Sequence, residues 1–196
     1  MIKLFSNSYC PNCHRTRIVL AEKELPIDTV EVEEDQIPQV LLDLNPYGTL
    51  PTIVDRDKVF FEATILNEYL DERYPHPPLK PGSPADRAQM RLAVMRIEQE
   101  LYSLYFNLKK VRRKTEVLRK FRTYLESLDH HFSMQEYFIG ECYTLADITM
   151  APILWRLTPE RIDTSNWKNL EGYMKRLFDR PSFQRALTEN EQMMHH

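Results

Sequence analysis

The domain organisation is set by the run Tyr74-Pro75-His76-Pro77-Pro78-Leu79-Lys80-Pro81-Gly82-Ser83-Pro84. Five of its residues are prolines. Proline fixes φ and has no amide hydrogen to donate, so this run cannot form a helix or a central strand. It predicts a stiff linker over 74–84, with one domain over 1–73 and a second over 85–196.

Short strands and helices alternate on the N-terminal side of this linker. Apolar runs predict four strands, over 2–6, 27–33, 52–55 and 58–61. Amphipathic segments predict three helices, over 12–24, 40–44 and 62–73. This order of elements is typical of a small α/β domain with a mixed sheet.

The rest of the chain is predicted to be helical. Two apolar stripes recur at steps of three or four residues: Met90, Val94, Ile97, Leu101, Leu104 and Leu108, and Val117, Phe121, Leu125, Leu128 and Phe132. Such stripes pack a helix against a core. Further helices are expected over 143–157, 170–178 and 183–187. Thr144 and Asp147 have capping-box spacing at the start of the first of these.

Composition restricts the class of function. The chain of 196 residues is 42% hydrophobic, with a net charge of −3 and a mean hydropathy of −0.51. These values support a core, and no apolar run is long enough for a transmembrane helix. The first residues run into a strand without an apolar leader, and the three cysteines do not form a disulfide framework. We therefore expect a cytoplasmic protein with no membrane contact.

One segment of the chain is strongly basic. Eight cationic residues lie within it, opposed only by Glu116: Lys109, Lys110, Arg112, Arg113, Lys114, Arg119, Lys120 and Arg122. A solvated helix face is the simpler interpretation. An acidic partner surface or a DNA backbone is the alternative.

The motif Cys10-Pro11-Asn12-Cys13 follows the first predicted strand. A Cys-x-x-Cys at the start of a helix is the redox motif of thioredoxin-like proteins. A helix N-terminus lowers the pKa of the first cysteine, which makes Cys10 a candidate catalytic nucleophile and Cys13 a candidate resolving thiol. Two unreactive reduced thiols are the alternative. Two further ligands at finger-like spacing are absent from the sequence, so no metal site is expected.

His76 stands between two prolines in the linker. A residue before proline is held near extended or polyproline geometry, which reduces the entropy lost when a partner docks. The imidazole can donate and accept hydrogen bonds near neutral pH. The alternative is a linker whose histidine only contacts water.

A thioredoxin-like unit, a proline linker and an all-α second domain together resemble the cytosolic glutathione S-transferase fold. The resemblance rests on the motif after the first strand, on Leu50-Pro51, on Glu62 and on Thr144 with Asp147. It implies a cis peptide bond before Pro51. It also implies a site equivalent to the glutathione site, formed by Cys10, Leu50, Pro51, Glu62 and Ala63.

The chain also resembles, more closely, the bacterial stringent starvation protein A family, in Arg17–Lys23, Glu68–Arg73, Tyr74–Leu79 and Ala151–Leu157. That family binds RNA polymerase holoenzyme as a homodimer and contacts the primary sigma factor. The resemblance implies a transcription regulator active in stress or starvation, without a cofactor, that meets DNA only within the polymerase complex. The implied partner-binding residues are Tyr74, Pro75, His76, Pro77 and Pro78.

Ala63 departs from the transferase pattern, in which a serine follows the acidic residue and binds glutathione. Loss of a hydrogen bond to a charged ligand group costs about 1.5–3 kcal/mol, which is about ten- to a hundred-fold in affinity. Glutathione transferase activity is therefore expected to be weak or lost. The alternative that stays open is a glutathione-dependent thiol transferase, of the omega or glutaredoxin type, that uses Cys10.

Overall fold

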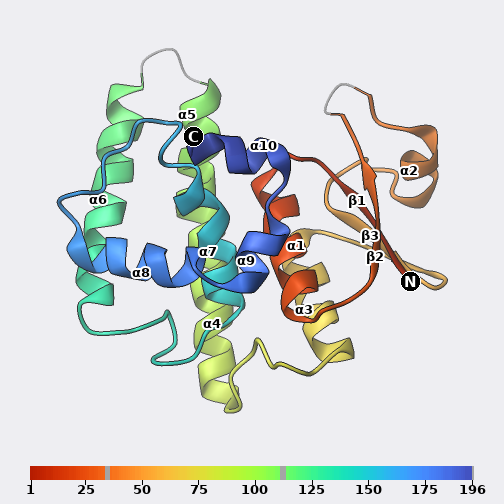
Figure 1. Cartoon of the computed structure of the whole chain (residues 1–196), viewed down its shortest axis with the longest axis horizontal. Helices are drawn as coiled ribbons and strands as arrows, with labels where there is room; N and C mark the ends of the chain where they lie inside the picture. Colours follow the sequence, from red (N-terminus) through yellow and green to blue (C-terminus); the bar gives the residue numbers. More distant parts are fainter. Residues whose placement is uncertain (34–35, 111–113, 196) are drawn as a thin grey trace. The chain divides into compact units, whose positions relative to one another are not determined.

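The computed structural model describes residues 1–33, 36–110 and 114–195. The chain divides into two compact units, one of residues 1–78 with 181–196 and the other of residues 79–180. The first unit holds a sheet with helices, and the second is helical (Figure 1). The predicted fold class, an α/β thioredoxin-like domain followed by an all-α domain, is confirmed.

The first unit is built on a four-stranded mixed sheet of order β2-β1-β3-β4. Its strands are β1 (Ile2–Ser6), β2 (Ile27–Glu31), β3 (Thr52–Asp55) and β4 (Lys58–Phe61). β1 runs parallel to β2 and antiparallel to β3, and β3 runs antiparallel to β4. All four predicted strands are present, and β2 ends two residues earlier than its apolar alternation indicated.

Helices cover both faces of this sheet. The helices of the first unit are α1 (Pro11–Glu22), α2 (Gln39–Leu44), α3 (Ala63–Arg73), α9 (Pro181–Ala186) and α10 (Glu189–Gln192), with a short 3-10 turn η2 (Met193–His195). α1 and α3 lie on one face and α2 on the other (Figure 1). Phe5, Val32 and Leu41 form a buried core cluster that includes one side chain from α2.

Residues 181–196 pack in the first unit, although the sequence pattern placed them in the second domain over 85–196. Phe183 of α9 is fully buried, and its ring centroid lies 5.1 Å from that of His14 in α1. Glu191 of α10 is also fully buried and pairs with Arg17 of α1. These contacts join chain segments far apart in sequence, so local periodicity carries no signal for them.

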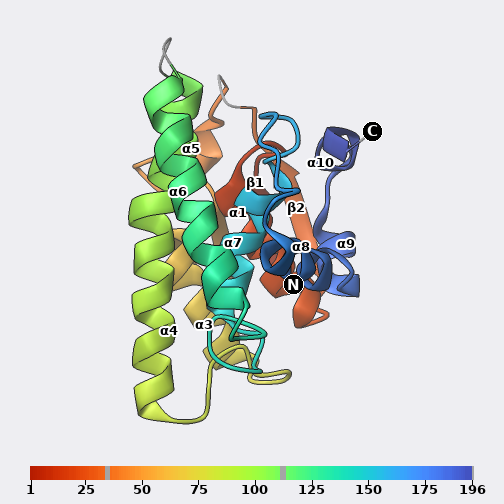
Figure 2. The ribbon, with the colours of Figure 1, turned by 90° about the vertical axis from the view of Figure 1, so that its left-hand side faces the viewer.

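The second unit consists of helices packed side by side (Figure 2). They are α4 (Pro84–Arg96), the π-helical segment η1 (Ile97–Tyr102), α5 (Ser103–Lys110), α6 (Thr115–Phe132), α7 (Leu145–Trp155) and α8 (Lys168–Phe178). A π turn holds more residues than an α turn and rotates the residues that follow it. As a result Tyr105 is buried, while Leu104, predicted to lie in the stripe, is only half-buried.

The capping box predicted at the start of α7 is confirmed. The Thr144 hydroxyl accepts from the Ala146 N–H at 3.3 Å, and Asp147 Oδ2 accepts from the Thr144 N–H at 2.8 Å. Every residue of α7 is buried. Across the described ranges, none of the helices combines the length and the apolar character that crossing a bilayer requires.

Candidate functional site

The run Tyr74–Pro78, here called the proline ridge, begins where α3 ends. Pro75, His76, Pro77 and Pro78 are exposed and Tyr74 is half-buried. The helix stops at Arg73 because a residue that precedes proline is pushed out of the helical region. The His76–Pro77 peptide bond is cis. The ridge therefore presents a histidine and three prolines to solvent, and its role in partner binding stays a prediction.

A buried lysine holds the backbone of the proline ridge. Lys23, which caps the C-terminus of α1, donates from Nζ to Asp71 Oδ1 at 2.6 Å and to the carbonyl oxygen of Pro77. The Lys23 side chain is 0% exposed and that of Asp71 is 4% exposed. Because a buried ammonium group is stable only when it is paired and hydrogen-bonded, these contacts tie the ridge to the interior of the unit.

The start of the proline ridge is held by a second carboxylate. Asp55 Oδ2 accepts from Arg73 Nε at 2.6 Å and from the Tyr69 hydroxyl at 2.8 Å. Burial acts to raise the pKa of Asp55, but the hydrogen bonds from Tyr69 and Arg73 hold it below its ordinary value. The guanidinium of Arg73 lies 5.4 Å from the ring centroid of Tyr74. Asp55 thus fixes the cation against which Tyr74 packs.

The two cysteines of the Cys-x-x-Cys motif differ in accessibility. Cys10 is the N-cap residue of α1 and is partly exposed, whereas Cys13 is fully buried. Burial raises the pKa of Cys13 well above its ordinary value, and the hydrogen bond with Cys10 adds to this. Cys13 therefore stays a thiol at neutral pH, and Cys10 is the sulfur that a reagent can reach.

The residues equivalent to the glutathione site come together at one end of the sheet. Phe5 pairs with Thr52, and Thr52 pairs with Phe61. The loops that follow β1, precede β3 and follow β4 therefore leave the sheet side by side; they carry Cys10, Leu50-Pro51 and Glu62-Ala63. The Leu50–Pro51 bond is cis, as the resemblance implied.

The side chain of the N-cap residue does not cap helix α3. Glu62 is its N-cap residue, has a φ of 64° in the left-handed region, and makes no capping hydrogen bond with its side chain. Ala63 is buried and carries no hydroxyl. The serine hydroxyl that the transferase pattern has at this position is therefore absent at residue 63.

The residues Cys10, Leu50, Pro51, Glu62 and Ala63 are here called the thiol site. The thiol site and the proline ridge lie at opposite ends of the same two helices. α1 and α3 both begin at the thiol site, and Lys23 and Tyr74 follow their C-termini. A helix of 12 residues such as α1 is about 18 Å long. The Thr16 hydroxyl bonds Asn67 Oδ1 at 2.9 Å between them. They are therefore two separate sites joined by a packed helix pair.

Ion pairs within the second unit take up part of the basic segment. Lys109 lies 2.7 Å and Lys114 3.8 Å from carboxylate oxygens of Glu160, and Lys120 lies 3.2 Å from Glu116. Arg112 and Arg113 lie outside the described residues. These pairs favour the simpler interpretation, a solvated helix face, for the described part of the segment.

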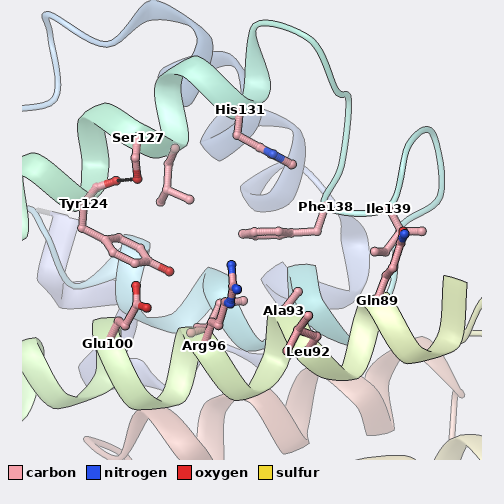
Figure 3. A pocket seen from close by; sticks show the side chains of 12 residues that line it. Gln89, Leu92, Ala93, Arg96, Glu100, Tyr124, Ser127, His131, Phe138 and Ile139 are labelled. Atoms are coloured by element: carbon pink, nitrogen blue, oxygen red, sulfur yellow. Dashed lines mark hydrogen bonds between the residues drawn. The ribbon is translucent and has the colours of Figure 1, made fainter. Parts of the chain in front are cut away.

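A cavity of about 380 Å³ opens between α4–η1 and α6 in the second unit. In Figure 3 the polar groups of Arg96, Glu100, Tyr124 and His131 line it together with the ring of Phe138. Burial raises the pKa of Tyr124 and lowers that of His131. This cavity was not predicted. The sequence held only a weak signal for it. Arg96 and Glu100 are four residues apart and Tyr124 and His131 are seven apart, so the members of each pair share a helix face.

Residues 4–78 match the family model of the glutathione S-transferase N-terminal domain, and residues 87–181 match that of the C-terminal domain. The chain is 41% identical over 194 residues to the stringent starvation protein A homolog of Pasteurella multocida, covering 95% of this chain and 90% of that protein. It is 41% identical over 199 residues to the homolog of Coxiella burnetii, covering 97% and 93%. Among solved structures it is similar to glutathione transferase Omega 3C from Trametes versicolor, with a TM-score of 0.85 and 26% identity, covering 99% of this chain and 88% of that one.

Proposed function

Since the chain belongs to the stringent starvation protein A family of the glutathione S-transferase superfamily, we propose that it is a transcription regulator. It binds RNA polymerase holoenzyme and its primary sigma factor as a homodimer during stress or starvation. The observation that carries this proposal is the proline ridge, in which four consecutive exposed residues stand on a hydrogen-bonded backbone.

The chemistry of the ridge suits a macromolecular partner better than a small ligand. Small molecules bind in concave pockets that cover most of their surface, whereas the ridge residues are exposed. Prolines have few backbone conformations to lose, so docking costs little entropy. His76 adds a group that donates and accepts hydrogen bonds, and Tyr74 adds an aromatic surface.

The homodimer part of the proposal is supported by the second unit. Leu92 and Met95 on α4 and Phe106 on α5 are large apolar side chains that stay exposed in the single chain. Leu92 and Met95 are three residues apart and therefore share a face of α4, and exposed apolar side chains that share a face are typical of surfaces that a partner covers. A second copy of this chain is the partner that the proposal assigns to them.

Substitution His76→Ala is expected to weaken binding to purified RNA polymerase holoenzyme at least tenfold, about 1.4 kcal/mol, because His76 is the polar group at the centre of the ridge. Binding is measured by biolayer interferometry with immobilised protein. His130→Ala, which removes an exposed histidine from α6, is the matched control and should bind as the unsubstituted protein does. Both variants should sediment at the mass of two 23.4 kDa chains. Equal binding by the two variants would remove His76 from the site.

The thiol site supports a second candidate, a glutathione-dependent thiol transferase. Cys10 is partly exposed at the N-terminus of α1, and the protein is similar in structure to an omega-class transferase. Cys10→Ser is expected to abolish reduction of a glutathione mixed disulfide, a loss of at least a hundredfold, because the nucleophile is removed. Cys142→Ser, which changes an exposed cysteine elsewhere, should keep the rate. Absence of any rate in the unsubstituted protein would rule out this candidate.

A further inference from the structure

The backbone amide groups of the proline ridge supply few hydrogen-bond donors to hold it in place. Pro75, Pro77 and Pro78 have no N–H, so of the five ridge residues only Tyr74 and His76 can donate from the backbone. The Tyr74 N–H is used by the helix, since it donates to the Leu70 carbonyl at 2.9 Å. A fixed backbone beyond this point therefore depends on donors that reach the ridge carbonyls from elsewhere.

Lys23 supplies such a donor. Its ammonium group lies in the interior of the first unit and donates to the carbonyl of Pro77 as well as to Asp71 Oδ1. Lysine side chains are almost never fully buried unless paired, because removal of the charge from water is costly. The Asp71 carboxylate offsets that cost and aims the ammonium group, which leaves a second N–H directed at the ridge.

From these contacts we infer that Lys23 is a positioning residue of the proline ridge, with Asp71 as its counter-ion. Lys23 does not touch the partner. It fixes the carbonyl of Pro77, and with it the direction in which His76 is presented, before the partner arrives. Because this role concerns partner binding, it rests on the proposed function.

A pair of variants distinguishes the effect of losing the Lys23 donor from the effect of losing the Asp71 charge. Asp71→Asn removes the carboxylate charge but keeps an amide oxygen that can accept from Lys23 Nζ, so the donor to the Pro77 carbonyl stays. Because the buried ammonium group then lacks a counter-ion, this variant is expected to be less stable than the unsubstituted protein, and its binding is measured under conditions where urea unfolding shows it folded. Lys23→Met/Asp71→Asn removes the donor as well and leaves no unpaired buried charge. Both carry the same neutral residue at 71, so they differ only at Lys23. If the double variant does not fold, Lys23→Leu/Asp71→Leu serves in its place, because an apolar pair often replaces a buried ion pair without loss of stability.

The affinity of each variant for RNA polymerase holoenzyme is measured beside that of the unsubstituted protein and of His76→Ala. Asp71→Asn is expected to bind within about threefold of the unsubstituted protein. The double variant is expected to bind at least tenfold more weakly, because the partner must then order the ridge. Urea unfolding should show that the double variant keeps its fold.

A readout of ridge order distinguishes positioning from general structural damage. In the double variant, the ¹⁵N order parameter of the His76 amide is expected to fall from a rigid value of about 0.85 towards about 0.6. The amides of α1 should keep their values. Binding by the double variant at unsubstituted strength, while His76→Ala fails to bind, would overturn the role of Lys23 alone. Absence of binding by the unsubstituted protein would instead overturn the proposed function.

Discussion

Replacement of Glu191 by alanine is expected to lower the free energy of unfolding of the first unit by about 3–5 kcal/mol. Glu191 is fully buried. Its Oε2 lies 2.6 Å from Arg17 Nη2 and its Oε1 lies 3.3 Å from His14 Nδ1. The substitution leaves the buried guanidinium of Arg17 without a carboxylate. The loss is measured by urea unfolding followed by circular dichroism, together with hydrogen exchange of the α1 amides.

Two further variants test the cause of that loss. Glu189→Ala removes an exposed carboxylate from the same short helix, and should change the free energy of unfolding by less than about 0.5 kcal/mol. Arg17→Met/Glu191→Met removes both charges, and should recover part of the stability because no buried charge is left unpaired. The rest of the loss comes from the Thr188 N–H and hydroxyl, which donate to Glu191 Oε2 in the capping box of α10 and lose that acceptor. Equal effects of Glu191→Ala and Glu189→Ala would show that the C-terminal segment does not depend on this pair.

The four strands and the helices α1, α2 and α3 of the first unit were predictable because each is encoded locally. The strands β3 and β4 were placed at their observed bounds by two apolar runs on either side of Arg56-Asp57. The cysteine motif was placed at the start of α1, where Pro11 occupies the first helical turn. The prediction that Leu50-Pro51 lies beside this motif came from the family resemblance and not from the local sequence.

Features that depend on distant contacts were not predictable. Lys23 lies in the segment over 12–24 that was predicted to be an amphipathic helix, where a lysine is ordinarily solvated. It is buried instead, in contact with Asp71 and the Pro77 carbonyl. Glu191 lies in a charged C-terminal run with the pattern of a solvated turn, and its burial arises from Arg17. The spacing of the apolar residues that precede η1 does not indicate a π turn. The sequence therefore placed Leu104 in the core, whereas Tyr105 is the residue that is buried there. In each case tertiary contacts outweigh local pattern.

Replacement of Asp147, in the first turn of α7, is expected to have the second large effect on the free energy of unfolding. Asp147 is fully buried and accepts four hydrogen bonds. Its Oδ2 accepts from the N–H and the hydroxyl of Thr144, and its Oδ1 accepts from the Phe138 N–H at 3.1 Å and the Tyr173 hydroxyl at 2.9 Å. Asp147→Ala leaves these donors unsatisfied at the start of a helix whose residues are all buried. The free energy of unfolding of the second unit should fall by at least about 3 kcal/mol at neutral pH.

Tryptophan fluorescence measures this loss, because Trp155 and Trp167 both lie in the second unit. Asp179→Ala is the matched control, since Asp179 is an aspartate of the same unit that is paired with Lys175 at the surface. A surface pair of this kind contributes less than about 1 kcal/mol. Similar losses in the two variants would show that the hydrogen bonds of Asp147 do not hold α7 in place.

The same carboxylate makes stability depend on pH with a definite sign. Burial raises the pKa of Asp147 to about 6, although the hydrogen bonds from Phe138, Thr144 and Tyr173 oppose the shift. The folded protein therefore binds this proton more tightly than the unfolded chain, whose aspartates titrate near about 3.9. Its contribution to stability is fully present below about pH 4 and is lost as the pH rises through about 6. The difference in unfolding free energy between the unsubstituted protein and Asp147→Ala should thus be larger at pH 4 than at pH 7, by up to about 3 kcal/mol. A smaller difference at pH 4 would mean that the hydrogen bonds outweigh burial and hold the carboxylate ionised.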